Sequence, residues 1–587
     1  MRARKPSTES DTQEVEIMQL IIDGIATEIV AGERLLDIVQ RLGLDTADLK
    51  TRPIAANIAG ETFTLNYIPL REESTPGVQQ GTLRRAVRAA NGVVSLLRYD
   101  SARGNRVYER TMLFVFLLAM RKLYPKTRVR INYAIGAGLF ARVGDGMRLS
   151  QQEVDRIKKA MRDIVDADLT LERKRIDIDD AIDFFSADGQ EDKVRLLKYR
   201  QFSFFDVYRQ EDYLDYFYGE MAPSTGYASV FDLQAQRGGL LLLRPSAENP
   251  NKPAKHVSMP RFAGVFSESE EWGRLMHCTV VADLNDMVLS GEIRTLIRVN
   301  EALHEKRFAQ LADEIIQRGA RAILIAGPSS SGKTTSANRL CTQLRIHGKT
   351  PVLVSLDDYY LNREQLKPGP DGTVDLEDIA TIDVPQFQAD LTRLLMGEEV
   401  ELPKFDFIHQ KRSLAGHKLR IDESTPLIIE GIHGLNPELL PAAVDQALIF
   451  RLYVSALTTL NLDDHNRIPT TYLRLLRRMV RDHETRGASV ERTLSMWNSV
   501  RAGEEKWIFP FQEDADAIFN TTLIYEPAVL KKHIFPLLSA VRPESVYYDE
   551  ARSIVKFLNY FVEADVEDEI PPTSILREFV GGNTFYR

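Results

Sequence analysis

The sequence predicts a multidomain α/β protein whose C-terminal half is built on a parallel sheet with helices on both faces. Its 587 residues are too many for one hydrophobic core and suggest roughly three to five domains. Apolar runs that end in glycine or acidic residues alternate with helical stretches in the C-terminal half, as in strand–helix–strand units. Short apolar runs around single helices in the N-terminal half instead favour a β-grasp unit followed by an α+β unit.

The composition is that of a soluble globular protein, with 44% hydrophobic and 27% charged residues. A net charge of −9 argues against a general nucleic-acid binder, which usually carries a basic excess. Cys278 and Cys341 lack metal-ligand spacing and fit a reducing compartment without disulfides. The longest apolar run, Met112 to Met120, is far shorter than the ~20 residues of a membrane span. We therefore expect a cytoplasmic protein without a membrane segment.

Changes in composition along the chain divide it into six segments. Residues 1–15 are polar and lack the apolar core of a signal peptide. A Pro/Asn-rich linker begins at Ser246. The expected segments are a disordered tail (1–15), a β-grasp domain (16–78), an α+β domain (79–245), a linker with connecting helices (246–318), the α/β domain (319–540) and a helical tail (541–587).

The most specific motif is the sequence Gly-Pro-Ser-Ser-Ser-Gly-Lys-Thr at residues 327–334. It follows the apolar run Ala322–Ala326 and precedes a helical stretch, which gives a strand, a glycine-framed loop and a helix start. Such a loop points backbone N–H groups at a phosphate, and the helix dipole adds to the attraction. Lys333 would reach the β- and γ-phosphates and Thr334 would bind Mg²⁺. The predicted nucleotide-binding residues are Gly327, Pro328, Ser329, Ser330, Ser331, Gly332, Lys333, Thr334 and Thr335, with ATP and Mg²⁺ as cofactors.

Two further apolar runs end in acidic residues. Pro351–Leu356 leads into Asp357, and Leu427–Ile429 leads into Glu430. Carboxyl ends of parallel strands line the ligand crevice, so Asp357 could accept a proton from an attacking hydroxyl or hold a metal-bound water. Taken alone, the first pattern is better explained by an Asp-rich turn, and an apolar strand that ends in Glu is common, so the second pattern is weak by itself.

The following stretches offer candidate substrate contacts. Phe405 and Phe407 would point the same way in an extended segment and could stack on a flat ring, although plain core packing explains them equally well. Arginines recur at helical spacing before the expected helix end at Gly487: Arg474, Arg477, Arg478, Arg481 and Arg486. They fit a lid that supplies positive charge to a phosphoryl-transfer transition state, or a solvated basic face.

Taken in order, these motifs resemble the uridine kinase family of the phosphoribulokinase/uridine kinase group. The resemblance implies Asp357 as the general base at a nucleoside 5′-hydroxyl, with Lys333, Arg481 and Arg486 also catalytic. It implies Thr334, Glu430 and Asp357 as Mg²⁺ ligands, directly or through water. The implied substrate-binding residues are Asp375, Phe405, Phe407, Gln410, Arg412 and Arg478.

Some positions depart from that family's pattern. Phe405 and Gln410 stand where uridine kinases read the pyrimidine with tyrosine and histidine, and Phe405 cannot donate the phenolic hydrogen bond. His409 lies one position early, and Ala488 replaces a basic residue of the lid pattern. The segment Asn461–Tyr472 is an insertion relative to short uridine kinases. These departures leave open which nucleobase the substrate would carry.

The N-terminal half resembles two modules of threonyl-tRNA synthetases. Residues 16–78 look like a TGS domain, and the next block looks like the second additional, editing domain, through Leu123–Pro125, Leu171–Lys174 and Asp180–Phe185. Arg110 and Phe114 stand where the editing histidines belong, so we expect that a zinc or hydrolytic site is lost. We expect instead a regulatory, binding or oligomerisation module and a homo-oligomeric protein.

The first functional hypothesis is an ATP-dependent nucleoside kinase, a phosphotransferase with an alcohol acceptor on a small-molecule nucleoside. A kinase for another small hydroxylated metabolite is the alternative enzyme. An NTP-dependent regulator of translation is a second class, but a GTPase needs an Asn-Lys-x-Asp motif after the phosphate loop, and Asn251-Lys252 precedes it. A third class is an RNA-binding protein. The negative net charge disfavours RNA binding, and a tRNA gel shift at physiological salt would show whether the protein binds tRNA.

Overall fold

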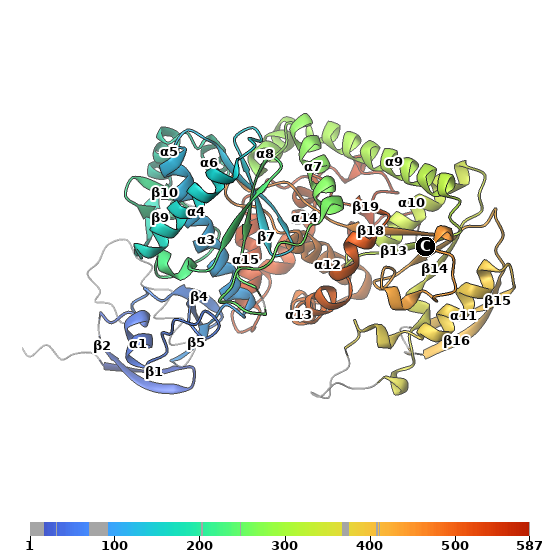
Figure 1. Ribbon diagram of the computed structural model, residues 1–587, viewed down its shortest axis with the longest axis horizontal. Helices are drawn as coiled ribbons and strands as arrows, with labels where there is room; N and C mark the ends of the chain where they lie inside the picture. The colour runs from blue at the N-terminus through green and yellow to red at the C-terminus, as the bar shows by residue number, and fades with distance from the viewer. Residues whose placement is uncertain are drawn as a thin grey trace, which may run out of the picture. The chain divides into compact units, whose positions relative to one another are not determined.

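The computed structural model describes residues 17–30, 32–69, 92–200, 203–246, 248–366, 375–406, 409 and 411–585 (Figure 1). These residues form two compact units, each described here by itself. The first unit comprises the described parts of Met1–Gln190 and Phe202–His256, and the second those of Glu191–Gln201 and Val257–Arg587. The helix α6 (Glu191–Leu197) therefore belongs to the second unit, although its sequence lies inside the expected α+β segment.

A mixed five-stranded sheet opens the first unit, in the order β2-β1-β5-β3-β4. The parallel pair β1/β5 is its centre, and the other neighbours are antiparallel. The short helix α1 packs on the sheet because its apolar positions Leu35, Ile38 and Val39 face the buried Leu20 and Ile22. β5 lies beyond residue 78, where the first domain was expected to end. The elements are β1 (Ile17–Ile22), β2 (Ile25–Val30), α1 (Leu35–Arg41), β3 (Ala55–Ile58), β4 (Glu61–Thr64) and β5 (Val93–Leu97).

The rest of the first unit surrounds the helix α3 (Ala102–Leu123). Ser101 caps its start by accepting a hydrogen bond from the Gly104 N–H, and its apolar run Met112–Met120 is buried throughout. No helix within the described ranges is long and apolar enough to cross a membrane. The remaining elements are β6 (Val129–Ile135), β7 (Gly138–Val143), α4 (Gln151–Asp166), β8 (Arg173–Asp177), α5 (Ile178–Ala187), β9 (Phe204–Gln210), β10 (Tyr213–Asp215), β11 (Asp232–Gln236) and β12 (Gly239–Leu243), arranged as antiparallel sheets β11-β12-β7-β6 and β10-β9-β8.

The second unit is built on a five-stranded sheet in the order β14-β17-β13-β18-β19, with every pair parallel. Its central strand β13 is buried at all positions, which requires cover on both faces of the sheet. The predicted C-terminal parallel sheet is confirmed. Its strands are β13 (Ala322–Ala326), β14 (Val352–Ser355), β17 (Leu427–Glu430), β18 (Ile449–Ser455) and β19 (Ala517–Asn520).

Helices and one hairpin complete this unit (Figure 1). The segment 246–318, expected to hold connecting helices, contains α7 (Pro260–Leu275), α8 (Val281–Ser290) and α9 (Ile293–Arg318), and Gly291 ends α8 with a left-handed φ of 82°. The other elements are α10 (Lys333–Ile346), α11 (Val384–Leu395), β15 (Val400–Asp406), β16 (Lys411–Leu419), α12 (Thr470–Arg486), α13 (Val490–Trp507), α14 (Glu526–Ser539), α15 (Tyr548–Leu558) and α16 (Arg577–Val580).

Candidate functional site

The glycine-framed loop joins the carboxyl end of β13 to the first turn of α10. A Cβ at Gly327 would lie 2.0 Å from the Val454 carbonyl oxygen, so only glycine fits there. Ser330 and Gly332 have left-handed φ values of 58° and 87°, which turn the loop sharply before the helix. Ser331 is buried, and its carbonyl accepts a hydrogen bond of 2.7 Å from Thr521. The geometry is that of an anion cradle at a helix N-terminus.

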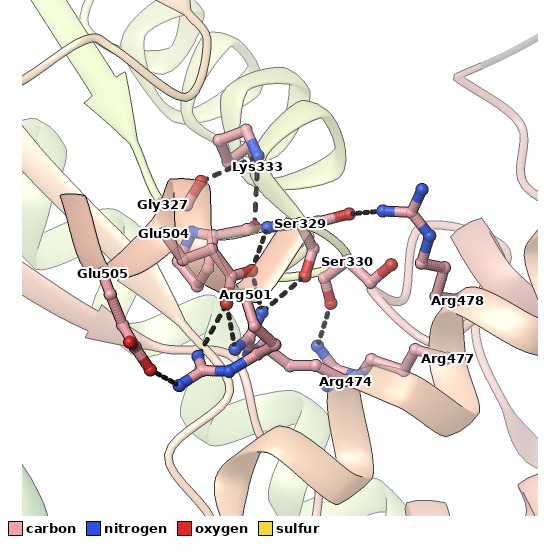
Figure 2. Close-up of polar contacts among 11 residues, drawn as sticks. Gly327, Ser329, Ser330, Lys333, Arg474, Arg477, Arg478, Arg501, Glu504 and Glu505 are labelled. Atoms are coloured by element: carbon pink, nitrogen blue, oxygen red, sulfur yellow. Dashed lines mark hydrogen bonds and ion pairs between the residues drawn. The ribbon is translucent and has the colours of Figure 1, made fainter. Parts of the chain in front are cut away.

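Lys333 is folded across this loop. Its Nζ donates to the carbonyl oxygens of Gly327 at 3.0 Å and Pro328 at 3.2 Å (Figure 2). Thr334 and Thr335 follow in the first turn of α10, where backbone N–H groups have no partner within the helix. An ammonium, two hydroxyls and the backbone N–H groups of the first helical turn therefore lie together where a polyphosphate would bind.

The acidic residues at the ends of β14 and β17 form a carboxylate pair beside the loop. Burial raises the pKa of Glu430 to about 7; Asp357 raises it further and Lys333 opposes the shift. Burial also raises the pKa of Asp357, against the opposing charges of Lys333 and Arg486. Two buried like charges favour a cation between them, so Asp357, Glu430 and the Thr334 hydroxyl fit an oxygen-ligated Mg²⁺.

Asp358 has a different task from Asp357. Its carboxylate accepts hydrogen bonds from Lys404 Nζ at 3.0 Å and from the Phe405 N–H at 3.2 Å. It thereby fixes the β15–β16 hairpin, and the Phe405 ring lies 5.8 Å from that of Tyr360. Of the two neighbouring aspartates, Asp357 is the one that faces Lys333.

The expected acceptor residues are only partly brought together. Asp375 is exposed, and its side chain accepts the Glu377 N–H at 3.0 Å. Arg412 makes an ion pair of 2.8 Å with Asp383, the N-cap of α11. The positions of Phe407 and Gln410 lie outside the described residues.

Glu377 lies close enough to Lys333 and Arg478 to interact with their charges, and the sequence analysis did not predict it as a site residue. A Cβ at Gly503 would lie 2.3 Å from the Glu377 Cβ, so the absence of a side chain at Gly503 makes room for this contact. Burial raises the pKa of Glu377 to about 7, with Arg478 and Lys333 opposing the shift and Glu504 and Asp375 adding to it. Its only sequence signal is the cluster of acids from 375 to 378.

The arginines of α12 divide into two groups. Arg474 and Arg477 are buried and pair with Glu504 and Glu526, with Nη2–Oε2 distances of 2.8 and 2.7 Å. They also donate to the loop carbonyls of Ser329 at 3.1 Å and Ser330 at 3.4 Å (Figure 2). These two arginines therefore hold the phosphate loop in place through its backbone carbonyls. Both are buried, so neither belongs to a solvated basic face.

The second group surrounds Asp482 on the same helix. Arg478, Arg481 and Arg486 lie 3.3, 3.1 and 3.2 Å from its carboxylate. Arg478 also donates to the Ser329 hydroxyl at 2.8 Å. One aspartate thus faces three guanidiniums, which leaves a positive excess beside the loop. The helix ends at Gly487 in a left-handed conformation, as predicted.

Glu504 on α13 is a second residue that the sequence did not reveal. Its fully buried carboxylate accepts the Ser329 N–H at 3.1 Å and Arg501 at 2.8 Å, besides Arg474. It connects the loop, α12 and α13 through one set of charge-assisted hydrogen bonds. A glutamate inside an amphipathic helix gives no sequence signal for such a role.

In the first unit, the positions that correspond to editing histidines hold a half-buried arginine and a fully buried phenylalanine. The Arg110 guanidinium donates to the Glu220 carbonyl at 2.6 Å, and burial lowers its pKa to about 10. The Phe114 ring packs 5.6 Å from that of Tyr213. Among the described residues, no three His, Cys, Asp or Glu side chains are grouped to hold a metal ion.

Residues 322–524 match the family described as the phosphoribulokinase / uridine kinase family. Uridine kinase from Lactobacillus helveticus is 27% identical over 195 residues, which cover 33% of this chain and 83% of that protein. Threonine--tRNA ligase from Clostridium kluyveri is 24% identical over 217 residues, which cover 37% of this chain and 31% of the ligase. The chain thus spans less than a third of the ligase's length.

Among solved structures, a possible uridine kinase from Bacillus stearothermophilus is 20% identical with a TM-score of 0.25, and the match covers 37% of this chain and 98% of that one. The family match shows that the C-terminal part contains a phosphoribulokinase/uridine kinase family domain, and the sequence match shows that the N-terminal region is similar to threonyl-tRNA ligase. Both predicted resemblances are confirmed at this level.

Proposed function

We propose that the second unit is an ATP-dependent nucleoside kinase that transfers the γ-phosphate to a nucleoside 5′-hydroxyl. The observation that carries the proposal is the convergence of Lys333, Asp357 and Glu430 at the carboxyl ends of adjacent parallel strands. That edge of an open parallel sheet is where ligands bind. The family match over residues 322–524 supports the same reaction class.

In this mechanism the loop N–H groups and Lys333 bind the ATP phosphates. Asp357 accepts the proton of the attacking hydroxyl, a role helped by burial, which raises the pKa of this carboxyl above its ordinary value. Arg478, Arg481 and Arg486 supply positive charge at the transferred phosphoryl group. Thr334, Glu430 and Asp357 would hold Mg²⁺, which neutralises charge on the phosphate oxygens when it is bound.

A neutral, hydroxylated acceptor fits the acidic side of the site. Asp357, Glu377 and Glu430 all act on the Tyr360 hydroxyl and, after burial, raise its pKa further. Carboxylates there would bind hydroxyl groups and repel an anionic acceptor. Phe405 offers a ring surface for a base. A kinase for another neutral polyol is the second candidate, because the same carboxylates would bind its hydroxyls.

For the first unit we propose a regulatory or oligomerisation role in a homo-oligomer. Its mixed sheet around α1 agrees with a TGS-like β-grasp module, and the α3–α4 block with a synthetase-like module. The hydrogen bond from Arg110 to the Glu220 carbonyl and the core packing of Phe114 support a role other than editing.

The test is a panel of nucleosides, phosphorylated sugars and neutral polyols, incubated with ATP·Mg²⁺ and then with GTP·Mg²⁺, with ADP or GDP release as the readout. We expect release above background only with neutral nucleosides. Release with phosphorylated sugars alone would contradict the proposal, and release with neutral polyols alone would favour the second candidate.

A further inference from the structure

The C-terminal segment from Ser574 to Asn583 lies against the phosphate loop, outside the residues that match the kinase family. A Cβ at Gly332 would lie 2.7 Å from the Ile575 side chain, so this residue covers the loop directly. The Glu578 carboxylate accepts hydrogen bonds from both the hydroxyl of Thr335, at 2.6 Å, and its backbone N–H, at 3.3 Å. An acidic side chain thus caps the helix that would receive the nucleotide.

Packing fixes the segment in this position. Ile575, Leu576 and Phe579 are fully buried, and the Arg477 guanidinium lies 5.1 Å above the Phe579 ring. Ser574 donates to Glu301 at 2.5 Å, and the Tyr525 hydroxyl donates to the same oxygen at 2.8 Å. Glu578 is therefore presented by an anchored turn.

The donors that Glu578 uses are those of a phosphate subsite. Backbone N–H groups of such loops cradle the α- and β-phosphates, while the lysine reaches the β- and γ-phosphates. The Thr335 N–H lies two residues beyond Lys333 in the first helical turn, so among the phosphates it would meet the α-phosphate rather than the γ-phosphate that the lysine reaches. Glu578 also stands close enough to Glu430 to contribute to the raised pKa of that carboxyl, after burial and Asp357.

A carboxylate and a phosphate cannot share these two donors, and their negative charges repel. We propose that Glu578 is an internal competitor of the nucleotide: its carboxylate occupies the α-phosphate donors of Thr335 in the free protein and leaves them when nucleotide binds. The C-terminal segment then sets nucleotide affinity. This inference rests on the nucleotide site of the proposed function and is independent of the acceptor.

The test is calorimetric titration of the full chain with ADP·Mg²⁺ and no acceptor. We expect E578A to lower the ADP Kd about tenfold, as when a charge-assisted hydrogen bond no longer has to be broken. E578Q should fall between E578A and the wild type, because its amide oxygen still accepts from Thr335 without the charge. E569Q is the control, since Glu569 pairs with Arg294 and Arg298 at 2.7 and 2.8 Å on α9.

An unchanged or weaker affinity in E578A would overturn the proposal, the latter because Glu578 would then be a nucleotide ligand. Hydrogen exchange of the wild-type protein gives a second measurement that needs no variant. We expect faster exchange at residues 574–583 when ADP binds, and slower or unchanged exchange would overturn the inference. Failure of all variants and the wild type to bind ADP would overturn the nucleotide site itself, whereas normal binding without these effects would overturn only the role of Glu578.

Discussion

Glu504 connects the phosphate loop to α12 and α13 through hydrogen bonds to Ser329, Arg474 and Arg501. Removing its charge is therefore a direct test of how the site is held together. The change Glu504→Gln keeps the shape of the side chain and removes the charge that faces Arg474. Both partners are almost fully buried, at 0% and 1% exposure. Breaking a buried pair in this way costs about 3–5 kcal/mol.

In a unit of this size, about 2 °C of melting temperature is lost per kcal/mol, so E504Q should melt roughly 6–10 °C below the wild type. The assay is calorimetry of the full chain, following the transition that ADP shifts upward. The matched control is Glu505→Gln. This neighbour forms an exposed pair with Arg501 at 2.8 Å (Figure 2), which contributes about 0–1 kcal/mol. A melting temperature in E504Q equal to that of E505Q would refute the reasoning.

The same residue predicts an acid-dependent loss of stability. Burial alone would raise the pKa of Glu504, but Arg474 and Arg501 outweigh it and hold the pKa below its ordinary value of 4.5. Because the folded pKa is depressed, this stabilisation is present above pH 4.5 and is lost as the pH falls through the folded pKa. E504Q should lack that loss.

The remaining predictions concern the reacting groups. Lys333→Ala should lose ATP binding by removing the charge at the β- and γ-phosphates, and a calorimetric Kd near that of the wild type would exclude this role. Asp357→Asn should lower turnover by ~10²-fold or more while ADP binding persists, and unchanged turnover would assign the base elsewhere. Glu377 has a pKa raised from 4.5 to about 7 in the folded protein, so its contribution to stability is lost as the pH rises across that interval. The melting temperature of E377Q should therefore fall less between pH 5 and about 7.5 than that of the wild type. Glu505→Gln, a change at an exposed pair whose charge is not among the causes of the Glu377 shift, should keep the wild-type slope, and an equal effect of both variants would contradict the assignment to Glu377.

Local signals allowed the centre of the site to be predicted. The loop from Gly327 to Thr334 is contiguous, and its flanking strand and helix follow from apolar runs and periodicity. The acids after β14 and β17 could be found because parallel strands bring their carboxyl ends together. The arginines at helical spacing were also visible, although their separation into a buried pair and a group around Asp482 was not.

Long-range contacts explain what the sequence could not reveal. Glu504 meets Ser329 across 175 residues, and Glu578 meets Thr335 across 243. Nothing in the local pattern of either glutamate differs from that of an ordinary helical acid. The pairing of β5 with β1 and β3 is likewise a property of the folded sheet. Such contacts depend on tertiary packing, which periodicity and spacing do not encode.

The most direct measurement of the central claim is mass-spectrometric identification of the product formed from ATP·Mg²⁺ and a neutral nucleoside. The account predicts a nucleoside 5′-monophosphate in amounts equal to the ADP released, and almost none with the Asp357→Asn chain. ADP formed without any phosphorylated nucleoside, or a phosphate attached to another position of the sugar, would contradict it.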